Sequence, residues 1–121
     1  MRDSIMRTRA KQLAIKIFAI CEEIKPGRGR AVLINQLVRS ATSIGANIHE
    51  ANYGSSRADF VNKLQIALKE CVETEYWIDL LDGTGCISPE CARELMVELG
   101  ILHRMLSKSI MTTKANSEVQ K

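Results

Sequence analysis

The stretch RSATSIGANIHEAN, residues 39–52, decides the fold because it carries two helical patterns at once. The apolar side chains of Ala41, Ile44, Ile48 and Ala51 follow one another at steps of three and four residues, which places them on one face of a helix. The side chains beside that face are small or polar, where an ordinary amphipathic helix carries solvent-facing Lys and Glu. The stretch therefore predicts a helix that is packed on more than one side.

The polar side chains form a row of their own, spaced by four, three, four and three residues: Gln36, Ser40, Ser43, Asn47 and Glu50. Small hydroxyl side chains let another backbone approach closely, and amide and carboxylate groups can fix the register of a contact by hydrogen bonding. Two interpretations stay open. The row can satisfy polar groups inside one bundle, or it can face a neighbouring subunit, and we favour the subunit interface.

Apolar seams with the same spacing continue along the rest of the chain. They predict helices over about residues 4–25, 30–53, 57–82 and 89–112, followed by a frayed polar tail at 113–121. Helices of roughly 20–25 residues that are joined by turns of about four to six residues connect as antiparallel neighbours. The prediction is one all-α domain of 121 residues, an antiparallel up-down-up-down four-helix bundle.

Two strings carry a resemblance to a known family. They are QLVRSATSIGANIHEA at 36–51 and FVNKLQIALKECVETE at 60–75. They resemble the pattern Q-L-x-R-[SA]-A-x-S-I-x-x-N-I-x-E-[GA], then F-[IV]-x-x-L-x-I-A-x-x-x-x-x-E-x-E, of the four-helix-bundle proteins first described from intervening sequences of 23S ribosomal RNA genes. The similarity extends over about residues 8–112. The chain departs from the pattern at Ala51, where glycine is usual, and at Lys69-Glu70, where small residues are usual.

The resemblance implies a mode of assembly more than an activity. Members of the family form antiparallel bundles that assemble into rings, commonly pentamers, and for most of them no activity is established. The accessory protein of diversity-generating retroelements, a more distant relative, is a basic pentamer that binds nucleic acid and a reverse transcriptase. The resemblance therefore implies a ring, with RNA or a nucleic-acid enzyme as partner.

Charge is distributed unevenly along the chain. Residues 1–40 contain nine Lys or Arg against three acids, whereas residues 66–100 contain two against eight. This opposition predicts neutralisation inside the bundle and pairing between subunits of a head-to-tail ring, and we favour some of both. The basic segment also suits phosphate groups. The candidate nucleic-acid-binding residues are Arg7, Arg9, Lys11, Arg28 and Arg30.

Two features of the basic segment bear on the nucleic-acid hypothesis. The segment PGRGR, residues 26–30, is a solvated turn in the competing interpretation. No aromatic residues are interleaved with the basic ones, so base stacking is not indicated.

Trp77 lies off the apolar seam of its helix. It is either a large residue at the edge of the core or an anchor in the subunit interface, and we include it among the interface candidates.

No catalytic or metal-binding motif is present in the sequence. HEAN at 49–52 contains only half of H-E-x-x-H, and no E-x-x-H motif occurs. The four cysteines form no C-x-x-C pair, and Cys86 and Cys91 are left without an assigned role. We expect no metal, no cofactor and no enzymatic activity.

The sequence favours a self-assembling scaffold that binds RNA or a ribonucleoprotein, with a protein–protein adaptor that binds no nucleic acid as the alternative. The expected partner in assembly is the chain itself, in a ring that is a pentamer by the family resemblance. No membrane and no small-molecule substrate are expected as partners. The chain shows neither a signal peptide nor an apolar run of about 18 residues, so we expect a cytoplasmic protein.

Overall fold

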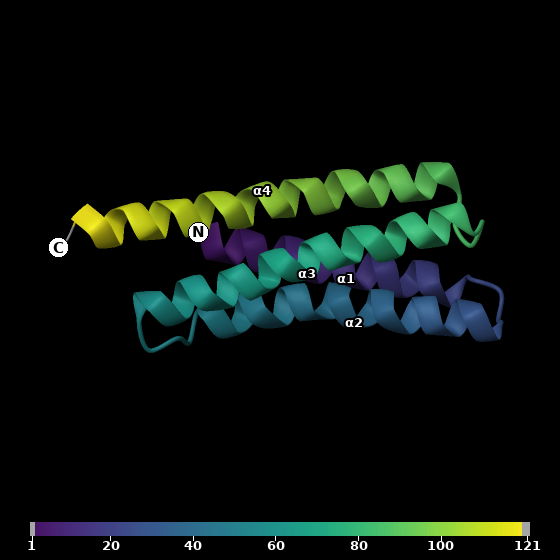
Figure 1. Ribbon diagram of the computed structural model, residues 1–121, viewed down its shortest axis with the longest axis horizontal. Coiled ribbons are helices and arrows are strands. Elements are labelled where there is room, and N and C mark those ends of the chain that lie inside the picture. The colour runs from purple at the N-terminus through teal and green to yellow at the C-terminus, as the bar shows by residue number, and fades with distance from the viewer. Residues whose placement is uncertain (1, 120–121) are drawn as a thin grey trace.

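The computed structural model, which describes residues 2–119 and the side chains of residues 5–116, contains the four predicted helices and no strand in the described part. The helices are α1 (Arg2–Glu22), α2 (Arg28–Ala51), α3 (Arg57–Gly83) and α4 (Pro89–Val119). They run up and down along one axis, so the all-α, antiparallel four-helix bundle is confirmed (Figure 1).

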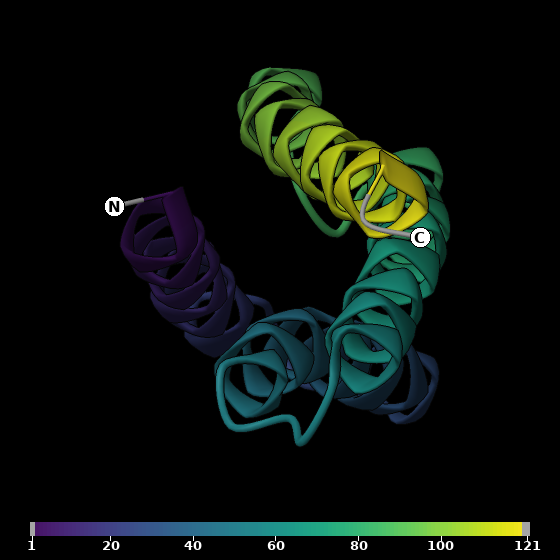
Figure 2. The same cartoon turned by 90° about the vertical axis from the view of Figure 1, so that its left-hand side faces the viewer.

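Each helix packs on the helix before and after it in the chain, and α4 returns to lie beside α1. Viewed along the bundle, the four helices follow one another in chain order, with α1 and α3 on opposite sides (Figure 2). The contact between α2 and α3 is the most extensive, and the contact between α1 and α4 is the smallest. The bundle is therefore held together mainly through α2 and α3.

The core is made by the apolar seams that the spacing predicts. In α2 the buried side chains include Leu37, Ala41, Ile44, Ile48 and Ala51, and the other three helices contribute equivalent rows. Burial of such side chains contributes roughly 1.5–3 kcal/mol each for the larger ones. Among the described side chains, no buried nitrogen or oxygen atom lacks a hydrogen-bond partner.

Two helix ends differ from the predicted ones by three residues or more, and the other boundaries by at most two. Helix α1 ends at Glu22 rather than near residue 25, because the amides of Glu23 and Ile24 turn back to the carbonyls of Ile20 and Cys21 ahead of Pro26. Helix α4 continues to Val119, so residues 113–119 are helical and the prediction of a frayed tail is wrong for them. No Gly or Pro follows Gly100 to stop the helix. Residues 120–121 of that predicted tail lie outside the described residues.

The turn before α3 confirms a predicted helix start. The Ser56 side chain accepts a hydrogen bond from the backbone N–H of Asp59 at 3.1 Å, and the acidic Asp59 lies in the first turn of the helix. This turn joins α2 to α3 at the end of the bundle where α1 begins and α4 ends (Figure 1). That end is where the candidate surfaces described below converge.

Candidate functional site

The polar row of α2 faces α3 of the same chain at its centre. The side chains of Ser40 and Thr74 are both 0% exposed, and their hydroxyl oxygens lie 2.9 Å apart. Thr74 donates to Ser40, which donates in turn to the carbonyl of Leu37, and the carbonyl of Glu70 lies within hydrogen-bond distance of Thr74. Ser40 thus has its polar partner inside one bundle, which accounts for this residue without a neighbouring subunit.

One end of the row is held by an ion-pair network. Arg39 contacts the carboxylates of Glu70 and Glu73 on α3, and its Nε donates to Gln36 at 3.3 Å. The indole N–H of Trp77 donates to the Glu73 carboxylate at 3.0 Å. Trp77 is partly buried against the core, so the structure places it at the core edge. Gln36 and Trp77 are therefore joined through Arg39 and Glu73.

The other end of the row stays partly accessible. Asn47 donates to the backbone carbonyl of Ser43 at 2.8 Å and to its hydroxyl at 3.1 Å, along one helix face. Glu50 pairs with Lys63 of α3 at 2.8 Å, and this hydrogen bond holds the pKa of the Glu50 carboxyl below its usual value. Ser43, Asn47 and Glu50 are not fully buried, so their role in a subunit interface stays a prediction.

The structure divides the candidate nucleic-acid-binding residues into two groups. Arg7, Arg9 and Lys11 lie in the first turns of α1, whereas Arg28 and Arg30 begin α2 at the opposite end of the bundle (Figure 1). A helical rise of about 1.5 Å per residue separates the groups by roughly 20 Å along the axis. The five side chains therefore form no single patch, and Arg30 is turned toward the carbonyl of Pro26.

The antiparallel topology instead gathers cations from three helices at one end. We call this the basic end, defined by Arg7, Arg9, Lys11, Arg57, Arg104, Lys108 and Lys114. The start of α1 and the second half of α4 are held side by side there, since Met6, Met105, Lys108 and Ser109 line one cavity of about 190 Å³. Arg104, Lys108 and Lys114 are not among the residues predicted from the sequence. Placing the charges on an antiparallel bundle would have found them.

Cations nearer the middle of the bundle are neutralised within the chain. Lys16 of α1 lies 3.1 Å from Glu98 and 3.7 Å from Glu94 of α4, and the hydrogen bond to Glu98 raises the pKa of Lys16. Arg39 is paired with acids of α3 as described above. The predicted neutralisation between the basic and acidic parts of the sequence therefore occurs inside one bundle.

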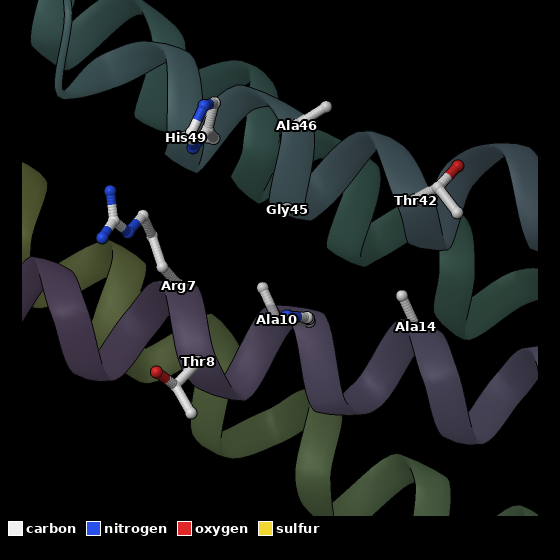
Figure 3. Close-up of a pocket in the computed structure, with 9 residues that line it drawn as sticks. Arg7, Thr8, Ala10, Ala14, Thr42, Gly45, Ala46 and His49 are labelled. Carbon is white, nitrogen blue, oxygen red and sulfur yellow. The ribbon is translucent and has the colours of Figure 1, made fainter.

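A groove between α1 and α2 opens at the basic end. It has a volume of about 460 Å³ and a floor of small residues, Ala10 and Ala14 of α1 with Gly45 and Ala46 of α2. Arg7, Lys11 and His49 line it together with Thr8 and Thr42, and none of the lining residues in the described part of the chain is acidic. Figure 3 shows Arg7 and His49 at the same end of the groove, with Ala10 and Ala14 directed toward α2.

The outer faces of two helices carry exposed apolar pairs. Ile15 and Phe18 lie three residues apart on α1, and Val72 and Tyr76 lie four residues apart on α3. All four are more than half exposed, and the ring of Tyr76 packs edge-on against Trp77 at 5.2 Å. Since α1 and α3 lie on opposite sides of the bundle, the two pairs mark separate surfaces (Figure 2).

The remaining features of the described residues give no further site. No group of three or more His, Cys, Asp or Glu side chains in residues 5–116 is placed to hold a metal ion. Burial raises the pKa of the Cys21 thiol to about 11 and that of Cys71 to about 12. Within the described part of the chain, no helix combines the length and the apolar character that crossing a membrane needs.

Comparison with known proteins places the chain in a family. The model of the 23S rRNA-intervening sequence protein family matches residues 2–108. A crystal structure of a protein of unknown function from the S23 ribosomal protein family of Bacteroides thetaiotaomicron VPI-5482 is 38% identical, with a TM-score of 0.86. The similarity covers 92% of this chain and 99% of that one. Comparison with curated proteins finds no match. On this evidence the chain belongs to the family of 23S rRNA-intervening sequence proteins.

Proposed function

We propose that the protein is a non-enzymatic scaffold that assembles with itself and binds RNA through its basic end. The observation that carries this proposal is the concentration of cations there without acidic partners. Among the described side chains, Arg7, Arg9, Lys11, Arg104 and Lys108 form no ion pair. Of the described acids at the same end, Glu50 pairs with Lys63, and the Asp59 carboxylate accepts a hydrogen bond from the Ser55 hydroxyl.

Unpaired cations gathered at one end of the bundle favour a polyanionic ligand. Each phosphate that a Lys or Arg contacts releases counterions, so such binding is insensitive to sequence and weakens steeply with salt. The name of the family refers to intervening sequences of 23S rRNA, which makes RNA the first ligand to test. The apolar pairs on α1 and α3 support self-assembly, because exposed apolar patches mark interaction surfaces.

The test is a gel-shift titration of structured RNA at about 50 and 200 mM salt. We expect micromolar binding at the lower concentration and a loss of at least tenfold in affinity at the higher one. If no RNA is retained even at the lower concentration, the RNA-binding proposal is wrong and the protein–protein adaptor becomes the better explanation. An affinity that does not change with salt would exclude phosphate contacts as its source.

A further inference from the structure

We propose that the α1–α2 groove is a binding site for single-stranded nucleic acid, in which Arg7, Lys11 and His49 hold phosphate groups and Tyr53 stacks on a base. This inference rests on the proposed function and assigns it to one site. The groove residues come from two helices that the fold brings together. In the sequence, Lys11 and His49 lie far apart, because the second half of α1, a turn and most of α2 stand between them.

The chemistry of the groove lining selects an anion. Three of the nine residues that line it are Arg7, Lys11 and His49, and none is acidic. In residues 5–116, neither Arg7 nor Lys11 forms an ion pair or a hydrogen bond, in contrast to Lys16 and Arg39. The nearest acid along the chain to His49 is Glu50, whose carboxylate is bound to Lys63. Donors in the groove are therefore available to a phosphate.

The floor of the groove allows a chain to lie in it. At Gly45 a methyl group would meet the side chain of Ala10 at 3.6 Å, so α1 and α2 approach closely through their smallest residues. Ala14 and Ala46 extend this floor on the two helices. Small side chains leave a trough between the longer Arg7, Lys11 and His49 side chains, and a sugar–phosphate backbone fits a trough that is lined by hydrogen-bond donors and by the Arg7 and Lys11 charges.

An aromatic ring lies beside His49 of the groove, although no aromatic residue is interleaved with Arg7 and Lys11 in the sequence. Tyr53 follows the end of α2, is 75% exposed, and its ring centroid lies 5.3 Å from that of His49. An exposed aromatic ring next to a basic groove is the arrangement that binds unpaired bases, because every base has a face that can stack. Bases in a duplex are already stacked, so the site favours single strands.

The test compares fluorescence anisotropy titrations of a fluorescein-labelled single-stranded RNA, its duplex, and a single-stranded DNA of the same sequence. The groove variant Arg7→Gln/Lys11→Gln is matched by Lys25→Gln/Arg93→Gln, which loses the same charge at the opposite end of the bundle. We expect the groove variant to bind at least tenfold more weakly, with a salt slope lower by about 0.7 for each lost contact. The matched variant should change affinity by less than twofold.

Tyr53→Leu separates stacking from charge. We expect it to weaken single-strand binding about tenfold with the salt slope unchanged, and to leave duplex binding as it was. Equal single-strand affinity in wild type and Tyr53→Leu would overturn the stacking role. If the groove variant and Tyr53→Leu lose RNA and DNA binding to the same extent, the site recognises the backbone and bases that both nucleic acids share. A loss of binding to only one of the two would overturn recognition through that shared chemistry.

The failure of this inference is distinguishable from failure of the proposed function. If wild type binds RNA and both double variants bind equally well, the groove is not the site and the proposed function stands. If wild type binds no RNA, both fail. A changed oligomer mass for Arg7→Gln/Lys11→Gln in light scattering, without a change for the matched variant, would show that a second copy of the chain occupies the groove and would overturn the inference.

Discussion

At the scale of single residues, the Ser40–Thr74 pair explains the most unusual part of the sequence. Two hydroxyl groups are fully buried where α2 meets α3, and Thr74 donates to Ser40, which donates to the carbonyl of Leu37. A buried hydroxyl without a partner costs about 1–3 kcal/mol, so the pair is stable only while both members are present in register. It therefore fixes how α2 and α3 align.

Removing one hydroxyl should measure this contribution. We expect Thr74→Val to lower the free energy of unfolding by about 1 kcal/mol, because Ser40 can still donate to the carbonyl of Leu37. Thr42→Val is the control, since the Thr42 hydroxyl bonds only to carbonyls of its own helix on an exposed face, and it should cost less than about 0.5 kcal/mol. Urea denaturation measures both.

A double-mutant cycle tests whether the two hydroxyls act as a pair. The combined Ser40→Ala/Thr74→Val variant should lose less stability than the sum of the two single variants, by about 0.5 kcal/mol or more. Strictly additive losses would contradict the pairing of the two side chains and leave each hydroxyl bonded to backbone alone.

The cysteines should differ sharply in reactivity. Burial raises the pKa of Cys21 to about 11 and that of Cys71 to about 12, so both remain neutral thiols near pH 8, and the thiolate is the reactive form. We expect a thiol-specific chromogenic reagent to label Cys86 first and Cys91 more slowly, since burial also raises the pKa of Cys91. Cys21 and Cys71 should react only after unfolding.

The raised pKa values of Cys21 and Cys71 predict how the stability of the fold changes at alkaline pH. A folded-state pKa above the ordinary value of 9.0 means that the folded protein holds its thiol protons while the unfolded chain loses them. The free energy of unfolding should therefore fall as the pH rises above 9.0. Rapid labelling of all four cysteines in the folded protein at pH 8 would contradict the burial of Cys21 and Cys71.

At the scale of helices, α1 and α2 approach each other at Gly45 and Ala10. An added methyl group there would meet Ala10 at 3.6 Å, which is an ordinary contact, and alanine favours a helix interior by about 1 kcal/mol over glycine. We expect Gly45→Ala to raise the melting temperature measured by circular dichroism. Gly45→Leu should lower it, because the larger side chain forces the helices apart at a cost of about 1–3 kcal/mol.

The opposite result would be informative about the same contact. If Gly45→Ala lowers the melting temperature, the added methyl group does not fit at 3.6 Å from the Ala10 side chain. The helices α1 and α2 would then lie closer together than this distance indicates. If Gly45→Leu is harmless, α1 is free to move away from α2 and the groove between them is not a fixed feature.

The helices were predictable from sequence because their signals are local. Apolar residues at steps of three and four define each seam, and Ser56 with Asp59 marks a helix start that the structure confirms. The partner of the polar row was not predictable from one helix, because a row such as Ser40 and Asn47 suits an adjacent helix of the same chain as well as a subunit. The buried partner Thr74 lies 34 residues away from Ser40.

At the scale of the whole molecule, antiparallel topology turns a charge difference along the sequence into one along the bundle axis. The start of α1 and the end of α4 bring cations together, whereas Arg28 and Arg30 are carried to the other end. This is why the predicted nucleic-acid set separates and why Arg104 and Lys108 join Arg7 instead. The candidate site was thus predictable only in part, since its membership depends on which helix ends meet.

The same topology makes a specific prediction about assembly. The exposed apolar pairs belong to α1 and α3, helices on opposite sides of the bundle (Figure 2), so a contact between the α1 pair of one copy and the α3 pair of another joins unlike surfaces. Such a heterologous contact must close into a ring or grow into a filament. We expect a closed ring, a pentamer by the family resemblance, and therefore a mass several times the 13.5 kDa of one chain.

Charge placed in that contact should break the ring without unfolding the bundle. Tyr76→Glu puts a carboxylate on a side chain that is 56% exposed in the single chain, and Val97→Glu is the matched control on α4, where Val97 is 63% exposed. We expect light scattering after size-exclusion chromatography to give a smaller mass for Tyr76→Glu only, with helical circular dichroism retained, because an unpaired buried charge costs several kcal/mol. A wild-type mass near 13.5 kDa would exclude the ring, and an unchanged mass for Tyr76→Glu would exclude the α3 surface.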